Sequence, residues 1–150
     1  MAKQEPGPHH FVFGDYAPAP ESVDHFEIKA QYDLFIDGKW VKAPKRFKTI
    51  NPATNEVLSE VGEAGKKQVD LAVKAARKAY EGEWGKLSGA ERGKYLYRIA
   101  RLIQERSREL AVTESMDGGK PIRESRDVDL PLVAAHFFYH AGWADKLDYA

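Results

Sequence analysis

Residues 34–41 read Leu-Phe-Ile-Asp-Gly-Lys-Trp-Val, and this stretch decides how the N-terminal part of the chain folds. Apolar and aromatic residues, which favour strands, flank the pair Asp37-Gly38. Such a pair favours a two-residue hairpin, because both central residues of the preferred turn need positive φ. The stretch therefore predicts two short antiparallel strands joined at Asp37-Gly38.

Two further short strands are expected after the hairpin, at 47–50 and 57–61. They flank residues 51–55, Asn-Pro-Ala-Thr-Asn, which carry turn chemistry. The apolar period then changes from about 2 to about 3.6, which predicts a helix over 66–81 that is ended by Gly82.

Three more helices follow. Ser88 and Glu91 have the spacing of a capping box and open a helix to about residue 106. A shorter helix, 108–116, stops at Gly118-Gly119. The last helix, 129–147, carries Pro131 in its first turn. We expect it to bury one apolar stripe, made of Leu130, Val133, Ala134, Phe137, Phe138 and Ala141. We also expect three tryptophans to anchor the core, namely Trp40, Trp84 and Trp143.

Residues 1–31 read as an arm. Prolines at 6, 8, 18 and 20 disfavour helix, although residues 25–31 could form a short helical turn. Docking of the arm on a neighbouring surface is the alternative, since its aromatic side chains would otherwise be exposed.

The composition is that of an ordinary globular domain: 150 residues, 43% hydrophobic, 31% charged and a formal net charge of +0. A neutral chain lacks the basic face that nucleic-acid binding needs. No apolar run approaches the ~20 residues of a membrane span, and no signal peptide is evident. The cytoplasm is therefore the expected location. The chain has no cysteine, which excludes disulfides and a cysteine nucleophile within these residues.

Few side-chain patterns point to chemistry. His136 and His140 lie one helical turn apart and could share a metal ion, but no third ligand is evident, and two histidines on the rim of an apolar helix are the favoured interpretation. Residues 117–121, Asp-Gly-Gly-Lys-Pro, lack the Gly and the Ser or Thr of a phosphate-binding loop. No dinucleotide fingerprint is present.

Five segments in order resemble the first part of the aldehyde dehydrogenases. The resemblance covers about residues 32–147, and only Asn55 and Gly118 depart from the usual pattern, each replacing a residue that tolerates left-handed φ. The segments are Phe35–Trp40, Asn51–Val57, Ala72–Arg77, Asp117–Pro121 and Ala141–Lys146.

The resemblance implies an α/β fold with a Rossmann-like cofactor domain, of which residues 32–150 would be an incomplete N-terminal part. These residues themselves are expected to be mostly α-helical, with a short N-terminal β-hairpin and edge strands. In the family a Cys thiolate attacks the aldehyde, hydride passes to NAD+ or NADP+, and a Glu activates water. Those residues would follow residue 150, and a full-length enzyme of this kind is expected to be a homo-oligomer.

Two family features would fall within the chain. A monovalent cation site matches the Thr49 side chain, the Ile50 carbonyl and Asp117, with a hydrogen-bonded helix terminus as the alternative. The substrate tunnel matches Val128 and Leu132. No catalytic or cofactor-binding residue is expected among these 150.

Three hypotheses follow. The first is that the chain is the N-terminal piece of an NAD(P)+-dependent aldehyde dehydrogenase, inactive by itself. The second is a stand-alone helical interaction module without enzymatic activity. The third is a small metal-dependent enzyme that uses His136 and His140.

Overall fold

The computed structural model describes residues 27–146 and Tyr149. The described chain contains five short strands followed by helices. The strands are β1 (Gln31–Tyr32), β2 (Leu34–Ile36), β3 (Lys39–Val41), β4 (Lys45–Ile50) and β5 (Val57–Glu63). The helices are α1 (Lys66–Glu81), α2 (Glu83–Lys86), α3 (Gly89–Glu105), α4 (Ser107–Gly118), α5 (Ile122–Glu124), the π-helical turn η2 (Ser125–Asp129) and α6 (Leu130–Trp143).

The predicted hairpin is confirmed. β2 pairs antiparallel with β3, and Asp37 and Gly38 both have positive φ, 52° and 73°. β4 pairs antiparallel with β5, and β1 lies parallel to β5 on its other side, giving the order β1-β5-β4. An ion pair between Asp33 and Arg46 ties the start of the hairpin to β4.

The predicted capping box is also present. The Ser88 N–H donates to Glu91 Oε2 at 2.8 Å, and the Glu91 N–H donates to Ser88 Oγ at 3.2 Å. Two donors that the first turn of α3 leaves unpaired are thereby satisfied. The helix predicted at 66–81 has the bounds of α1, and the one predicted at 108–116 is two residues longer at its end.

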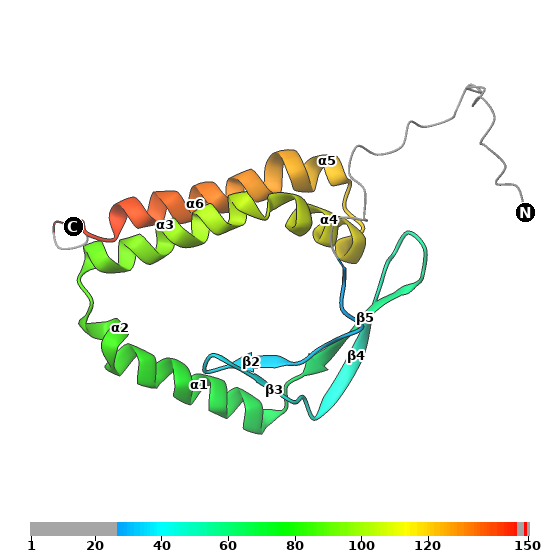
Figure 1. Cartoon of the computed structure of the whole chain (residues 1–150), viewed down its shortest axis with the longest axis horizontal. Helices are drawn as coiled ribbons and strands as arrows, with labels where there is room; N and C mark the ends of the chain where they lie inside the picture. Colours follow the sequence, from blue (N-terminus) through cyan, green and yellow to red (C-terminus); the bar gives the residue numbers. More distant parts are fainter. Residues whose placement is uncertain (1–26, 147–148, 150) are drawn as a thin grey trace, which may run out of the picture.

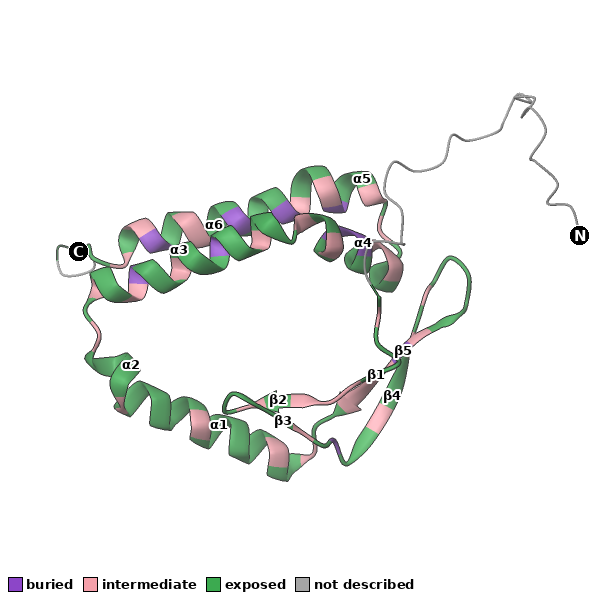
Figure 2. Ribbon diagram, in the orientation of Figure 1, coloured by how far each residue is buried: buried purple, intermediate pink, exposed green. Residues whose placement is uncertain are grey.

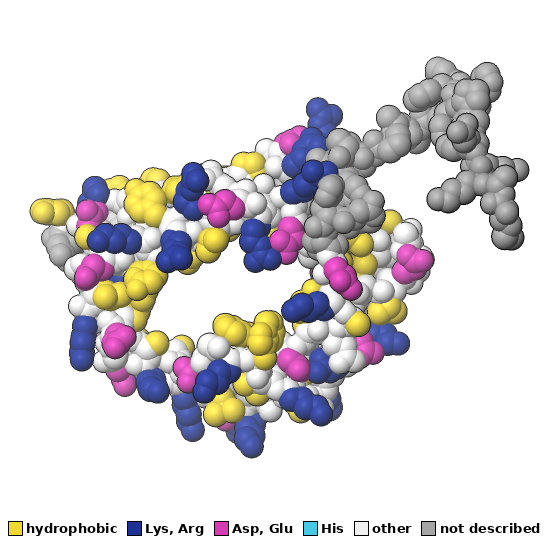
Figure 3. Space-filling view, in the orientation of Figure 1, with side chains coloured by type: hydrophobic (Ala, Val, Ile, Leu, Met, Phe, Trp, Pro, Cys, Tyr) yellow, Lys and Arg dark blue, Asp and Glu magenta, His cyan; other side chains and the backbone are white. Residues whose placement is uncertain are grey.

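The elements form two layers that enclose an opening (Figure 1). α3, α4 and α6 make one layer, and α1 with the β2–β3 hairpin makes the other. The α2 elbow joins the layers at one end, and the sheet meets α4 at the other. The opening persists when side chains are drawn, and apolar side chains gather on its rim (Figure 3).

The core is small and consists mostly of alanine. Buried residues lie mainly along the contact of α3 with α6 (Figure 2). Small side chains let the two helices approach closely, so the larger side chains lie on the flanks of the contact. The buried apolar residues are Ala43, Ala100, Ala111, Val112, Leu130, Ala134 and Ala141.

Several expectations were wrong in detail. Trp40, Trp84 and Trp143 are not core anchors, because 63%, 39% and 46% of each is exposed. Of the predicted stripe on α6, Val133 is exposed and the two phenylalanines are half-buried. Phe138 packs against Tyr97 of α3, with ring centroids 5.9 Å apart, but the described elements leave much of the stripe uncovered.

Two element boundaries also differ. The last helix is α-helical only from Leu130 to Trp143 and is preceded by a π-turn, whereas Leu147 lies outside the described residues. No helical turn forms at 27–31, because Gln31 pairs with β5 instead. The rest of the predicted arm lies outside the described residues. Among the described helices, none is long and apolar enough to cross a membrane.

Candidate functional site

The π-helical turn η2 is the least regular part of the helical layer. The Leu130 N–H donates to the Ser125 carbonyl five residues back, rather than four as in an α-helix. The turn is therefore wider than a turn of α-helix. Runs of this kind are rare in helices and often occur at functional sites. Val128 lies in this turn and Leu132 lies one turn later, in α6. Both are exposed, at 56% and 53%, so they present an apolar pair to whatever adjoins this face.

Polar contacts hold both ends of η2. Ser125, its first residue, is fully buried, and the Ser115 hydroxyl of α4 donates to its Oγ at 3.3 Å. Asp129, its last residue, forms an ion pair with Lys120. The turn is therefore fixed to α4 and to the segment that follows it.

Lys120 lies among acidic side chains. Its hydrogen bond to Asp129 raises the pKa of the ammonium group, and the charges of Asp129, Glu124 and Glu114 act in the same direction. Lys120 is therefore charged at neutral pH and offsets repulsion among three carboxylates.

The predicted cation-site residues come from two segments that meet at Pro52 and Gly119. Gly119, which caps α4 with φ 71°, packs so closely that a Cβ there would lie 2.6 Å from Pro52 Cγ. Thr49 and Ile50 end β4 just before Pro52, and Asp117 lies in the last turn of α4. The Thr49 hydroxyl donates to the Ser59 carbonyl at 3.5 Å, which leaves its lone pairs available.

The two histidines of α6 do not form a recognisable metal centre. Their rings stack with centroids 6.5 Å apart, and Tyr139 packs edge-on against His140. Within the described residues, no three His, Cys, Asp or Glu side chains are grouped so that they could hold a metal ion. A metal-dependent enzyme would need a third ligand from elsewhere.

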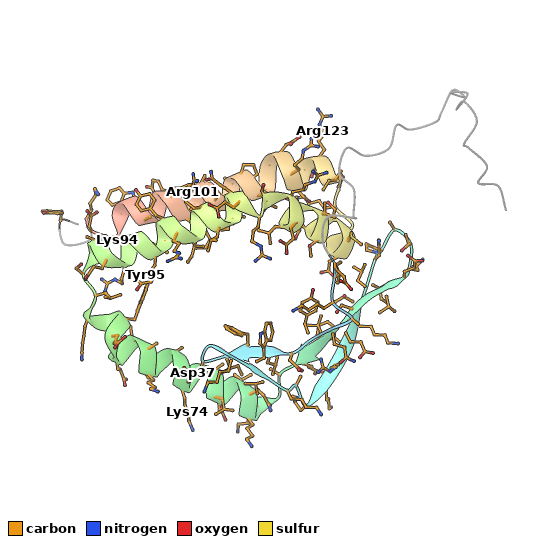
Figure 4. All side chains as sticks on the ribbon, viewed as in Figure 1. Asp37, Lys74, Lys94, Tyr95, Arg101 and Arg123 are labelled. Atoms are coloured by element: carbon orange, nitrogen blue, oxygen red, sulfur yellow. The ribbon has the colours of Figure 1, made fainter. Side chains whose placement is uncertain are left out.

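A groove of about 580 Å³ lies beside the α2 elbow. Trp84 and Tyr95 form its aromatic part, with their rings edge to face and centroids 5.4 Å apart. Tyr95 points from α3 towards α2, and Asp37 lies at the tip of the hairpin (Figure 4). The groove is one place where the chain presents apolar surface with no described element above it.

Sequence patterns do not indicate that Lys120 pairs with Asp129 or that Ser115 pairs with Ser125. Asp129 lies nine positions after Lys120, beyond Pro121. A π-turn has no distinctive residue preference, so only the structure brings these side chains together.

The comparisons with known proteins agree on one family. The aldehyde dehydrogenase family model matches residues 40–150. The putative aldehyde dehydrogenase DhaS of Bacillus subtilis is 47% identical over 117 residues, which cover 76% of this chain and 24% of that protein. A mitochondrial aldehyde dehydrogenase family 2 member B4 of Arabidopsis thaliana is 40% identical over 139 residues, covering 90% of this chain and 26% of that protein.

Solved structures give the same result. An NAD+ complex of an aldehyde dehydrogenase from Bacillus cereus superposes with a TM-score of 0.76 at 42% identity, over 78% of this chain and 24% of that one. The chain spans about a quarter of the length of the relatives it matches.

Proposed function

Because the chain belongs to the aldehyde dehydrogenase family, we propose that residues 32–150 form the N-terminal part of the cofactor-binding domain of an enzyme that oxidises an aldehyde to a carboxylate. The match of the family model over residues 40–150 carries this proposal. The fold supports it, since the exposed apolar side chains of α1, α3 and α6 suit helices that cover further structure.

NAD+ is the oxidant that the comparisons favour, since a relative of the same fold was solved in complex with it. NADP+ stays in the proposal as the alternative. The residues that would choose between the two cofactors are not assigned to this chain.

A fusion enzyme tests the proposal. Residues 1–150 are joined to the part of Bacillus subtilis DhaS that follows its matched segment, and NADH or NADPH formation is measured with short and long aldehydes. We expect turnover, and we expect replacement of the nucleophilic cysteine of the DhaS part by alanine to abolish it. A folded fusion without turnover, beside an active DhaS, would contradict the proposal.

The 150-residue chain alone is the negative control of that experiment. It has no cysteine and therefore no thiolate to attack the aldehyde carbon. We expect no reduced cofactor above a heat-inactivated sample.

The proposal includes a monovalent cation bound by the Thr49 hydroxyl, the Ile50 carbonyl and the Asp117 carboxylate. The packing of Gly119 on Pro52 supports it, because it brings the two segments together. Oxygen ligands of this kind suit a hard cation. A hydrogen-bonded helix terminus, without a cation, is the alternative.

Val128 and Leu132 are proposed to line the substrate tunnel of the complete enzyme. Their exposure supports this, because an apolar aldehyde needs apolar side chains that are not already covered. In the fusion enzyme, Leu132→Ala should change the relative kcat/KM of long and short aldehydes.

Cytoplasmic location and assembly into a homo-oligomer complete the proposal for the full enzyme. Cell fractionation with an antibody against this chain tests the location. Light scattering of the active fusion tests the assembly.

A stand-alone interaction module is the second candidate, and the groove around Trp84 and Tyr95 favours it. It predicts that the 150-residue chain is a stable monomer with a sharp unfolding transition and that it binds a partner through this groove. Broad unfolding and self-association would favour the enzyme segment instead.

A further inference from the structure

We propose that Lys120 and Ser125 are positioning residues that fix the rotation of the π-turn η2, so that Val128 meets the apolar part of an aldehyde. The inference rests on the proposed function, because Val128 reaches a substrate only in a complete enzyme. It adds two polar residues, neither of them on the apolar face, that would control how the enzyme chooses among aldehydes.

The first step is the asymmetry of the turn. Its first residue, Ser125, is fully buried, whereas Val128 is 56% exposed. Ser125 and Asp129 lie about one turn apart, so they share the face that points to α4 and the segment after it. Val128 lies on the outer face. Contacts that fix Ser125 and Asp129 therefore also fix the orientation of Val128.

The second step is that the turn needs holding. A π-turn has one residue more per turn than an α-helix and is less favourable, so it persists where other contacts determine it. Here the contacts are the Ser115–Ser125 hydrogen bond of 3.3 Å and the Lys120–Asp129 ion pair. The two contacts act at opposite ends of η2.

The third step concerns charge. Loss of the Lys120 ammonium would remove the ion-pair partner of Asp129 at a place where the charges of Glu114 and Glu124 also act. Repulsion among these carboxylates would favour rotation of Asp129 away from its present position. Val128, the preceding residue, would move with it.

Kinetics of the fusion enzyme test the proposal. In Lys120→Met, the ratio of kcat/KM for octanal to that for acetaldehyde should fall about tenfold, the size of effect expected from one misplaced apolar contact. The change should lie in KM for octanal, with KM for NAD+ unchanged. Lys120→Arg, which keeps the charge, should restore the ratio.

Lys74→Met is the matched control, because Lys74 is a solvent-facing lysine of α1 in the other layer (Figure 4). A general loss of stability would affect both aldehydes equally, whereas a positioning role changes their ratio. An unchanged ratio in Lys120→Met, or equal effects of the two lysine variants, would overturn the proposal.

Amide exchange in the 150-residue chain separates this inference from the proposed function. The Leu130 N–H closes the π-turn on the Ser125 carbonyl. It should exchange faster in Lys120→Met and Asp129→Asn than in Lys74→Met. If the fusion lacks all activity, the proposed function fails, but the exchange rate of the Leu130 amide still tests the positioning role. Equal exchange rates in all variants would overturn that role.

Discussion

A Cβ placed on Gly89 would lie 2.1 Å from the carbonyl oxygen of Ala144. The start of α3 and the end of α6 thus touch through their backbones. One turn later, a Cβ on Gly93 would lie 3.0 Å from the Ala141 carbonyl. This contact explains why the core of the helical layer is built from glycine and alanine.

Gly89→Ala should separate α3 from α6. The new methyl meets backbone rather than a flexible side chain, so we expect the free energy of unfolding to fall by about 1–3 kcal/mol. Urea unfolding followed by circular dichroism measures this. Gly142→Ala is the control, because its Cβ would meet only the Tyr97 hydroxyl at 3.9 Å. A loss in Gly142→Ala equal to that in Gly89→Ala would contradict the close contact.

Gly119→Ala should cost more stability than Gly38→Ala. Both glycines have positive φ, 71° and 73°, so both substitutions carry about 1 kcal/mol of backbone strain. A Cβ on Gly38 meets nothing within 4 Å, whereas one on Gly119 meets Pro52 at 2.6 Å. The difference between the two unfolding free energies measures the packing of α4 on the β4–β5 turn. Equal losses would mean that this packing does not form in solution.

Acid should weaken the start of α3 through Glu91. Hydrogen bonds from the backbone and then the side chain of Ser88 lower the pKa of the Glu91 carboxyl below its usual 4.5. Because the pKa is lower in the folded chain, the ionised carboxylate stabilises the fold at any pH above the pKa of the unfolded chain. This contribution is lost as the pH falls through the pKa of the folded chain. The urea midpoint should therefore drop on acidification from about pH 7 to about pH 3.

Glu91→Gln should show a smaller drop over the same range, because glutamine cannot be protonated there. Glu83→Gln, outside the capping box, serves as the control and should behave as the unchanged chain. Identical pH profiles for all three proteins would show that the capping box adds nothing to stability.

Potassium chloride should raise the unfolding midpoint more than choline chloride at equal ionic strength, if Thr49, Ile50 and Asp117 bind a monovalent cation. Thr49→Val removes an oxygen ligand and Asp117→Asn removes the negative charge of another, so each should abolish the difference. Asp70→Asn, on the exposed face of α1, should leave it unchanged. Equal midpoints in both salts for the unmodified chain would favour the hydrogen-bonded helix terminus.

The elements that sequence patterns predicted well are those with local causes. The Asp37-Gly38 turn, the Ser88 capping box and the end of α1 at Gly82 each depend on residues a few positions apart. The wrong prediction that the tryptophans are buried has a different cause. Trp40 and Trp84 are large and apolar, but each contacts one aromatic ring, Phe35 or Tyr95, and the described elements leave 63% and 39% of their surface exposed.

The candidate site divides in the same way. The sequence by itself determined the family resemblance, the hairpin, the longer helices and the absence of a cysteine nucleophile within these residues, because these depend on residue identity and short-range order. Only the tertiary structure joined Lys120 to Asp129, Ser115 to Ser125 and Gly119 to Pro52. These contacts link separate segments, and their geometry depends on how helices pack and on a π-turn that no local residue preference encodes.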